Sequence, residues 1–299
     1  MEIDCRWIGP EYKGPASRTY ADGTFEGWGG SILRRVTNKY GAYEEVLKYA
    51  ADDAETPEEI ESMLKLPDLD NYDFSVITEA CKRYNDKFIL AGWASTFYFP
   101  TLVRSMENIL VDMAINPEMA HCLFKKCIDW HLGYHERLLD AGKGRIDAMQ
   151  IADDFSTQLN PLISLEMFRE YFREPLKKFA DLAKSYGAKA YLHCCGSAYK
   201  LINEFIGAGI EILDPIQTKA AGMNPVGLKN EFGDKLAFHG AAETQLILPC
   251  GTPDDVRGNA RELVGILGEN GGYILSSCHL LQADVPIQNV LALYETGNR

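Results

Sequence analysis

Short apolar runs alternate with amphipathic helical stretches through most of the chain, and this alternation limits the folds that the chain can adopt. Six such runs occur, at 87–92, 146–151, 188–193, 210–215, 235–240 and 272–277. Strands of this length that alternate with helices predict a parallel sheet covered by helices. No G-x-G-x-x-G motif follows an early strand, and no G-x-x-x-x-G-K-[ST] loop occurs. We therefore expect an α/β fold of the (β/α)8 TIM type and not a dinucleotide-binding sheet.

The first 40 residues follow a different pattern. Gly9-Pro10, Gly14-Pro15 and the glycines of 27–30 interrupt any periodicity there. We expect residues 1–40 to form an irregular N-terminal arm that can supply further strands, and residues 41–299 to form one barrel domain. The segment 42–51 is expected to be helical. Thr56, followed by Pro57 and two acidic residues, predicts a second helix that extends through residue 63.

The charge of the chain excludes some classes of partner. Lysine and arginine number 30 and aspartate and glutamate 43, so the formal net charge is −13. Nucleic acids and anionic membranes attract a basic surface, so neither is expected as a partner. The chain has no run of 18 apolar residues, and residues 1–10 lack a signal-peptide pattern, so we expect a cytoplasmic protein. In that compartment the eight cysteines are expected as thiols or metal ligands.

Residues with reactive or polar side chains follow almost every predicted strand. In chain order they are Trp93; Asp153, Asp154 and Gln158; His193, Cys194 and Cys195; Asp214 and Gln217; His239 and Glu243; and Cys278 and His279. The C-terminal ends of all strands in a TIM-type barrel meet at one mouth, where active sites lie. We therefore expect most of these residues to surround one pocket.

His193-x-Cys195, together with Cys278 at a later strand end, predicts a metal site. An imidazole and two thiolates suit zinc, and three protein ligands leave the fourth position open, as in catalytic zinc sites. The alternative is that these three side chains only pack inside the barrel. Cys194 is expected to point away from its neighbours, because side chains alternate along a strand.

The adjacent acids Asp153 and Asp154 also have two interpretations. Carboxylates after a buried strand can bind a substrate cation, transfer protons or complete a metal site. They can instead cap the following helix from a solvated loop. His239 is a candidate for proton transfer, with a purely structural hydrogen-bonded imidazole as the alternative.

Several longer stretches resemble one known family. They are IADDFSTQLNP at 151–161, HCCGS at 193–197, ILDPIQ at 212–217, FHGAAETQ at 238–245, LPCGTPDDV at 248–256 and GGYILSSCHLLQADVPIQN at 271–289. They are similar to the uroporphyrinogen decarboxylase superfamily, and more closely to its corrinoid-dependent methyltransferase branch. The resemblance implies a (β/α)8 barrel and, as in the enzymes of that branch that methylate coenzyme M, zinc at His193, Cys195 and Cys278. The arginine-rich N-terminal motif of the decarboxylases does not occur here.

These residues and the resemblance lead to one hypothesis, a zinc-dependent methyltransferase of a corrinoid pathway. Zinc is expected at His193, Cys195 and Cys278, and the cobamide is expected on a partner corrinoid protein, because this chain has no D-x-H-x-x-G motif. The other reactant is a small methylated substrate or a thiol. The expected catalytic residues are Asp153, Asp154 and His239, and the expected substrate-binding residues are Trp93, Gln158, Gln217, Glu243 and His279.

Two alternatives share the predicted fold. One is a carboxy-lyase of the uroporphyrinogen decarboxylase type, which uses no metal. The other is a non-catalytic barrel that carries a substrate or binds the corrinoid protein. A homodimer is compatible with the sequence.

Overall fold

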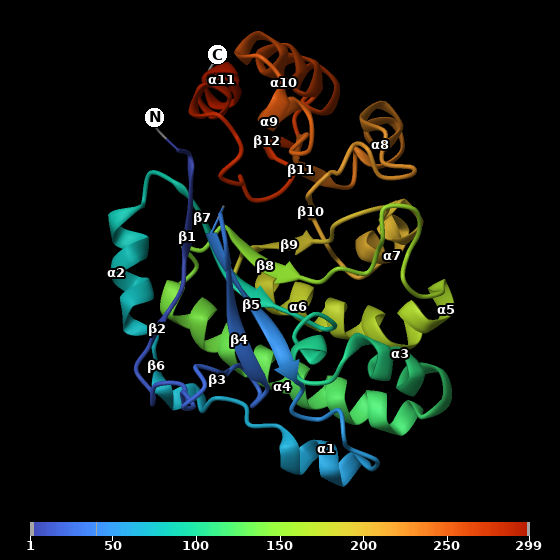
Figure 1. Cartoon of the computed structure of the whole chain (residues 1–299). Helices are drawn as coiled ribbons and strands as arrows, with labels where there is room; N and C mark the ends of the chain where they lie inside the picture. The colour runs from blue at the N-terminus through green and yellow to red at the C-terminus, as the bar shows by residue number, and fades with distance from the viewer. Residues whose placement is uncertain (1–2, 40, 298–299) are drawn as a thin grey trace.

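A sheet of seven parallel strands forms the centre of the computed structural model, which describes residues 3–39 and 41–297 (Figure 1). In hydrogen-bonded order the strands are β1 (Cys5–Ile8), β7 (Phe88–Ala94), β8 (Ala148–Ala152), β9 (Lys189–His193), β10 (Ile212–Asp214), β11 (Ala237–Ala242) and β12 (Tyr273–Ser277). The last six coincide with the six apolar runs, so the predicted parallel sheet is confirmed. The seventh strand, β1, comes from the N-terminal arm and pairs with β7.

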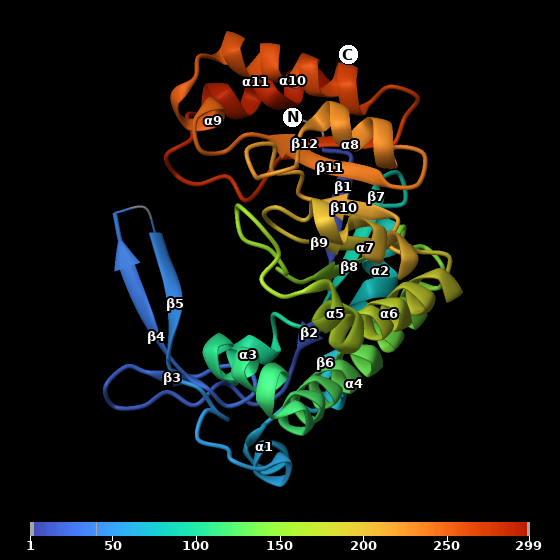
Figure 2. The same ribbon diagram turned by 90° about the vertical axis from the view of Figure 1, so that its right-hand side faces the viewer.

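The sheet is curled, and helices cover its outer side, as in a TIM-type barrel (Figures 1 and 2). In the described part of the chain, β1 and β12 are the edge strands of this sheet and do not pair with each other. The closed barrel of eight strands that the sequence led us to expect is therefore not confirmed. The structure has a seven-stranded, TIM-like half barrel.

Helices follow most strands of this sheet, and local signals determine where several of them begin. In α10, Thr252 and Asp255 cap each other reciprocally and Pro253 occupies the first turn. Thr56 likewise caps the N-terminus of the predicted helix α1. The α-helices are α1 (Pro57–Met63), α2 (Ser75–Arg83), α3 (Met106–Ile115), α4 (Pro117–Gly142), α5 (Leu165–Phe168), α6 (Glu174–Ser185), α7 (Ile202–Gly207), α8 (Pro225–Phe232), α9 (Ile247–Cys250), α10 (Pro253–Leu267) and α11 (Ile287–Gly297). Short 3₁₀ helices are η1 (Leu69–Asn71), η2 (Pro100–Leu102) and η4 (Tyr199–Leu201), and η3 (Arg169–Arg173) is a π-helical segment between α5 and α6.

Two groups of apolar side chains fill the space on either side of the sheet. The larger lies between the sheet and the helices and includes Ile89, Ile151 and Leu213. The smaller includes Tyr191 and Ile212 and belongs to the inner side of the curl. The two groups alternate along the strands because successive side chains point to opposite faces. The inner face therefore carries residues such as Tyr191 and His193 toward the centre of the curl.

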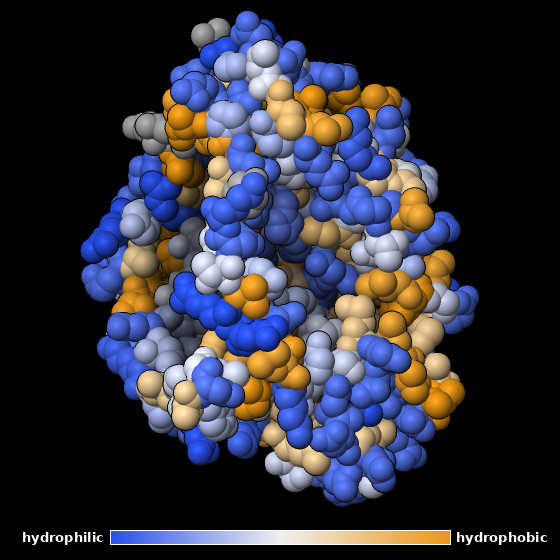
Figure 3. Space-filling model, viewed as in Figure 1, coloured by the Kyte–Doolittle hydropathy of each residue, from blue (hydrophilic) through white to orange (hydrophobic). Residues whose placement is uncertain are grey.

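The N-terminal region forms two small antiparallel sheets. In one, β2 (Glu11–Tyr12) pairs with β6 (Tyr72–Asp73); the other contains β3 (Phe25–Glu26), β4 (Ile32–Asn38) and β5 (Gly41–Lys48). Figure 2 shows β4 and β5 as a ribbon that stands apart from the central sheet. The surface beside this ribbon is hollowed in the space-filling view (Figure 3).

The helix expected at 42–51 is wrong, because residues 41–48 form strand β5. Cross-strand pairing with β4 replaces the internal hydrogen bonds of a helix: Val36 faces Tyr43, and Arg34 faces Glu45 with an ion pair of 2.5 Å. β-branched and aromatic residues favour this extended pairing. The expected boundary after residue 40 lies outside the described residues, between β4 and β5.

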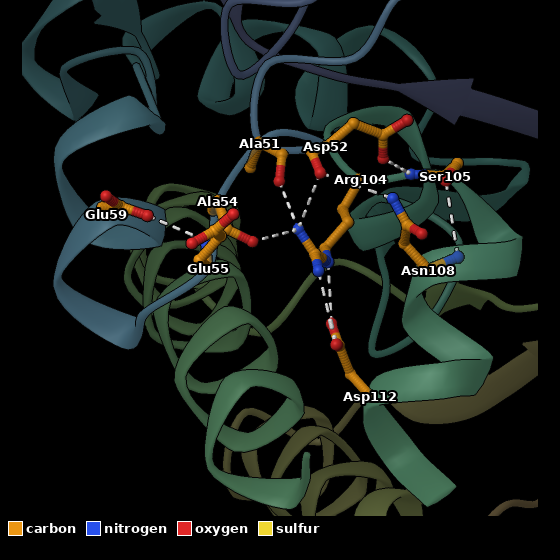
Figure 4. A network of polar contacts seen from close by, with 9 residues as sticks. All are labelled: Ala51, Asp52, Ala54, Glu55, Glu59, Arg104, Ser105, Asn108 and Asp112. Atoms are coloured by element: carbon orange, nitrogen blue, oxygen red, sulfur yellow. Dashed lines mark hydrogen bonds and ion pairs between the residues drawn. The ribbon is translucent and has the colours of Figure 1, made fainter. Parts of the chain in front are cut away.

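Buried Arg104 connects the segment after β5 to α3 (Figure 4). Its guanidinium donates to the Asp112 carboxylate at 2.7 Å and to the backbone carbonyl oxygens of Ala51 and Ala54. Asp52 in turn accepts a hydrogen bond from the Ser105 amide at 2.7 Å. A buried cation with this many acceptors is fully paired, so the network holds the segment after β5 against α3. None of the described helices is both long and apolar enough to span a bilayer.

Candidate functional site

Five consecutive strands of the central sheet, β8 to β12, bring most of the expected site residues together at their C-terminal ends. Ala152 of β8 is the register partner of His193 of β9, and His193 is the partner of Asp214 of β10. Asp153 and Asp154, which follow β8 directly, therefore lie beside the C-terminal end of β9. This juxtaposition follows from the parallel register, because equivalent strand ends lie on one edge.

Asp214 forms hydrogen bonds with two histidines of neighbouring strands. His193 Nδ1 donates to Asp214 Oδ2 at 2.6 Å, and His239 Nδ1 donates to Asp214 Oδ1 at 2.5 Å. The Tyr191 hydroxyl lies 3.1 Å from the same His239 nitrogen. Burial opposes ionisation of Asp214, but the two imidazoles outweigh it and hold the pKa of this carboxyl well below its ordinary value. Asp214 is thus a buried carboxylate that fixes both imidazole rings.

The other nitrogen of His193 faces a thiol. His193 Nε2 lies 3.4 Å from Cys195 Sγ, and the ligand atoms of His193, Cys195 and His279 all lie within 4.8 Å of one another. Imidazole nitrogen and sulfur are ligands that zinc accepts in catalytic sites. A metal-binding histidine ordinarily donates its second ring N–H to a carboxylate, as His193 does to Asp214. Burial and the nearby Asp154 raise the pKa of the Cys195 thiol, so a cation is needed to stabilise its thiolate. The donor set therefore fits a zinc ion.

Cys278 is not part of this cluster in the described structure, so its expected role as a zinc ligand stays a prediction. Its buried sulfur lies 3.3 Å from the Thr244 hydroxyl. The next residue, His279, occupies the position beside His193, with ring centroids 5.9 Å apart. Adjacent residues beyond the end of β12 differ in direction, and only the path of the backbone decides which of them faces the cluster. His279, which the sequence predicts to contact substrate, lies among the candidate ligands, and its role in substrate binding stays a prediction.

Asp153 and Asp154 have different surroundings. Asp153 is fully buried and accepts five hydrogen bonds, from the Ser95 and Thr96 hydroxyls and from the amides of residues 96, 97 and 98, at 2.6 to 2.8 Å. Burial raises its pKa, and these hydrogen bonds offset part of the rise. Asp154 is only partly buried and accepts from the Cys195 amide at 2.7 Å. Asp153 therefore anchors the segment after β7, whereas Asp154 borders the metal cluster.

The remaining expected residues also differ in their surroundings. Gln158 Nε2 donates to Gln217 Oε1 at 2.7 Å, and the same oxygen accepts from the Gly196 amide at 3.1 Å, so this pair lies beside the His-x-Cys loop. Glu243 is buried, and its oxygens accept from the amides of residues 245, 246 and 247 at 2.6 to 2.9 Å. Its carboxylate caps the turn before α9. Trp93 lines a separate pocket against α4.

The sequence places Asp214 at a strand end but predicts no role for it. The available signal was its position: inward-facing residues occur at every second position of β9, and Asp214 ends the neighbouring strand. Its bridging contacts depend on the pairing of β9 with β10 and of β10 with β11. The spacing of these residues along the chain does not indicate that the Asp214 carboxylate contacts both His193 and His239.

The family model for uroporphyrinogen decarboxylase (URO-D) matches residues 46–299 of this chain. Among solved structures, a methyltransferase from Methanosarcina mazei is similar with a TM-score of 0.65 and 19% sequence identity, over 89% of this chain and 75% of that chain. The apo form of 3-keto-D-glucoside 4-epimerase from E. coli has a TM-score of 0.46 and 13% identity, over 76% of this chain and 88% of that chain. Among curated proteins, none matches the sequence. The family match begins within β5 and includes His193, Cys195 and His279.

Proposed function

This chain belongs to the uroporphyrinogen decarboxylase family, and on that premise we propose that it is a zinc-dependent methyltransferase of a corrinoid pathway. It moves a methyl group between a small methylated substrate or thiol and a cobamide on a partner corrinoid protein. The observation that carries the proposal is the cluster of His193, Cys195 and His279, with the second nitrogen of His193 held by Asp214. The likeness to the Methanosarcina mazei methyltransferase supports the same fold.

A metal in this cluster supplies the chemistry that methyl transfer requires. Bound zinc is a Lewis acid that ionises a thiol or polarises a methylated heteroatom near neutral pH. His193 and Cys195 would hold it, and a third ligand would come from the segment after β12. His279 lies close enough to take that role, whereas the family resemblance implies its neighbour Cys278.

The protein's own side chains orient the reactants around this cluster. Asp214 fixes the His193 tautomer so that Nε2 points to the cluster, and its other oxygen holds His239. The Nε2 atom of His239 is then the basic nitrogen that accepts a proton from an incoming thiol or returns one to a leaving group. Asp154 positions Cys195 by accepting a hydrogen bond from the Cys195 backbone amide. Gln158 and Gln217 border the place where the substrate binds.

Decarboxylation of a porphyrinogen is the second candidate, because the family carries that name. A substrate with several carboxylates needs cationic side chains for recognition. The side chains that contact one another around this cluster are histidine, cysteine, aspartate, glutamine and tyrosine. This set favours a metal over a polycarboxylate, so methyl transfer is the function that we propose.

Metal analysis of matched variants tests the metal site. The purified protein should contain about one zinc per chain. Cys195→Ala and His193→Ala should lose it, and the pair His279→Ala and Cys278→Ala identifies the third ligand. The geometry predicts loss of zinc in His279→Ala and retention in Cys278→Ala. Full occupancy in Cys195→Ala would contradict the site.

A spectroscopic assay tests the reaction. With a corrinoid protein in the cob(I) state and a methyl donor, or with methylcobamide and a thiol, the enzyme should change the visible spectrum of the corrinoid. Chelation should stop the change, and added zinc should restore it. Release of carbon dioxide from a porphyrinogen, without any spectral change of a corrinoid, would establish the carboxy-lyase instead.

A further inference from the structure

All four tryptophans of the chain line one small pocket. Trp7 lies on β1, Trp28 between β3 and β4, Trp93 on β7 and Trp130 on α4. The cavity measures about 210 Å³, and neither the metal cluster nor Asp214 lines it in the described structure. Four separate parts of the chain thus converge on one aromatic cavity outside the proposed active site. Concave sites of this kind bind small molecules.

The aromatic walls hold one another in place. The Trp28 ring lies 4.9 Å from Phe99 and 5.8 Å from Trp130, both edge to face, and Trp130 stacks on Tyr134 at 5.3 Å. Each such pair adds stability beyond the area that it buries. These walls are therefore formed before a ligand arrives.

Two tryptophans border the opening of the pocket and are half exposed. Trp7 is 55% exposed and Trp93 48% exposed, which is unusual for the largest apolar side chain. Backbone contacts fix both residues: the Trp7 indole donates to the Gly92 carbonyl at 3.2 Å, and the Trp93 amide donates to His135 Nε2 at 3.0 Å. Gly92 permits this contact, because its φ is 89° and a Cβ there would lie 2.8 Å from the His135 ring.

The lining residues in the described structure include no lysine, arginine, aspartate or glutamate. Burial lowers the pKa of His135 to about 4 and the pKa of His131 well below its ordinary value, so both imidazoles are neutral at neutral pH. The pocket is therefore lined by several aromatic rings, whose faces carry a negative quadrupole, and by no charged side chain. The chain as a whole has a net charge of −13, which adds a field that repels anions.

We infer that this pocket binds a small cation whose charge is covered by methyl groups, such as a quaternary ammonium. Aromatic faces attract a cation that gives up little hydration, and several rings around one methylated ammonium recognise it without hydrogen bonds. A primary ammonium would lose hydrogen bonds to water and find no carboxylate among the lining residues. A phosphate or carboxylate would find no cationic side chain among the lining residues of the described structure. Binding here requires neither the metal nor methyl transfer.

Titration with choline chloride, followed by calorimetry and by tryptophan fluorescence, tests this inference. Saturable binding should change the fluorescence strongly, because every tryptophan lines the pocket. Two matched compounds separate charge from shape: 3,3-dimethyl-1-butanol has the same shape without the charge, and ethanolamine has a charge without the methyl groups. Both should bind more weakly than choline, and sodium chloride at equal ionic strength should give no signal.

Variants at the pocket opening locate the site. Trp93→Ala and Trp7→Ala should each weaken choline binding by roughly 3- to 30-fold, the range expected for one cation–π contact, and Trp93→Phe should weaken it less. Tyr43→Ala, at an equally exposed aromatic residue on the β4–β5 ribbon, is the control and should bind choline normally. His193→Ala should also bind choline normally. Absence of choline binding, equal binding of the neutral compound, or unchanged affinity in both tryptophan variants would overturn the inference.

Discussion

Adjacent residues Asp153 and Asp154 illustrate how different the roles of two carboxylates can be. In the structure, buried donors share the two carboxylate oxygens of Asp153. Asn at this position would place an amide group against those donors. Each buried donor left unpaired costs about 1 to 3 kcal/mol. We therefore predict that Asp153→Asn lowers the free energy of unfolding in urea by about 2 to 4 kcal/mol.

The neighbouring variant is the matched comparison. Asp154→Asn keeps an oxygen that can accept from the Cys195 amide, so its free energy of unfolding should change little. Its rate of methyl transfer should fall by about 10²- to 10⁴-fold if the carboxylate takes part in proton transfer. Equal stability of both variants, with equal activity, would place both acids in a simple capping role.

Buried His135 predicts a loss of stability in acid. Its pKa is about 4 in the folded chain, against 6.5 for a free imidazole, because burial disfavours the charged form. Between these values the unfolded chain binds a proton that the folded chain does not. The stability that depends on neutral His135 is therefore fully present above pH 6.5. The free energy of unfolding falls as the pH decreases from 6.5 toward 4, by about 3 kcal/mol for this residue.

His135→Gln tests this assignment, because glutamine can accept from the Trp93 amide and does not titrate. Urea unfolding at pH 7.5 and pH 4.5 should show a smaller difference for the variant than for the original chain. Part of the difference should remain, since burial also lowers the pKa of His131. Equal pH dependence of the two proteins would exclude His135 as a cause.

At the scale of elements, the β4–β5 ribbon differs from the rest of the chain. Most of its residues are exposed, including Tyr43 and Leu47, and it stands apart from the central sheet (Figure 2). A two-stranded ribbon with two exposed faces contributes little burial of its own. The helices α4 and α6, in contrast, each bury an apolar stripe against the sheet.

Shortening the ribbon should therefore leave the central sheet intact. We predict that replacing residues 34–45 by Asn-Gly, which favours a two-residue hairpin turn, changes the melting temperature by less than about 4 °C. Zinc content should also be unchanged, because the cluster comes from the ends of β9 and β12. A loss of cooperative unfolding, measured by circular dichroism, would show that the ribbon stabilises the whole chain.

At the scale of the whole molecule, the acidic balance limits how a partner docks. A net charge of −13 gives no broad basic surface for a corrinoid protein to recognise. Docking then depends on local contacts, which salt screens only weakly when they are buried. We predict that raising the salt from 50 to 300 mM weakens binding of the corrinoid protein by less than about tenfold, measured by calorimetry. A much steeper dependence would indicate a charged interface.

The sequence by itself determined the six C-terminal strands of the central sheet, the sheet edge at which the candidate residues gather, the closeness of His193 to Cys195, and the start of α10. These features depend on local patterns: alternation of apolar residues, capping residues and the common direction of parallel strands. The match to the family model confirms the family resemblance, whereas the metal site that the resemblance implies stays a prediction.

Only the tertiary structure decided which distant residues meet. Residues 41–48 form a strand because β4 lies beside them, and β1 joins the central sheet because β7 offers an edge. His279 groups with His193 and Cys195 although it lies far from them in the sequence. Asp214 joins two histidines, and four tryptophans share one pocket, because strands and α4 bring together residues far apart in sequence. Local patterns specify elements, whereas contacts between elements depend on how the whole chain packs.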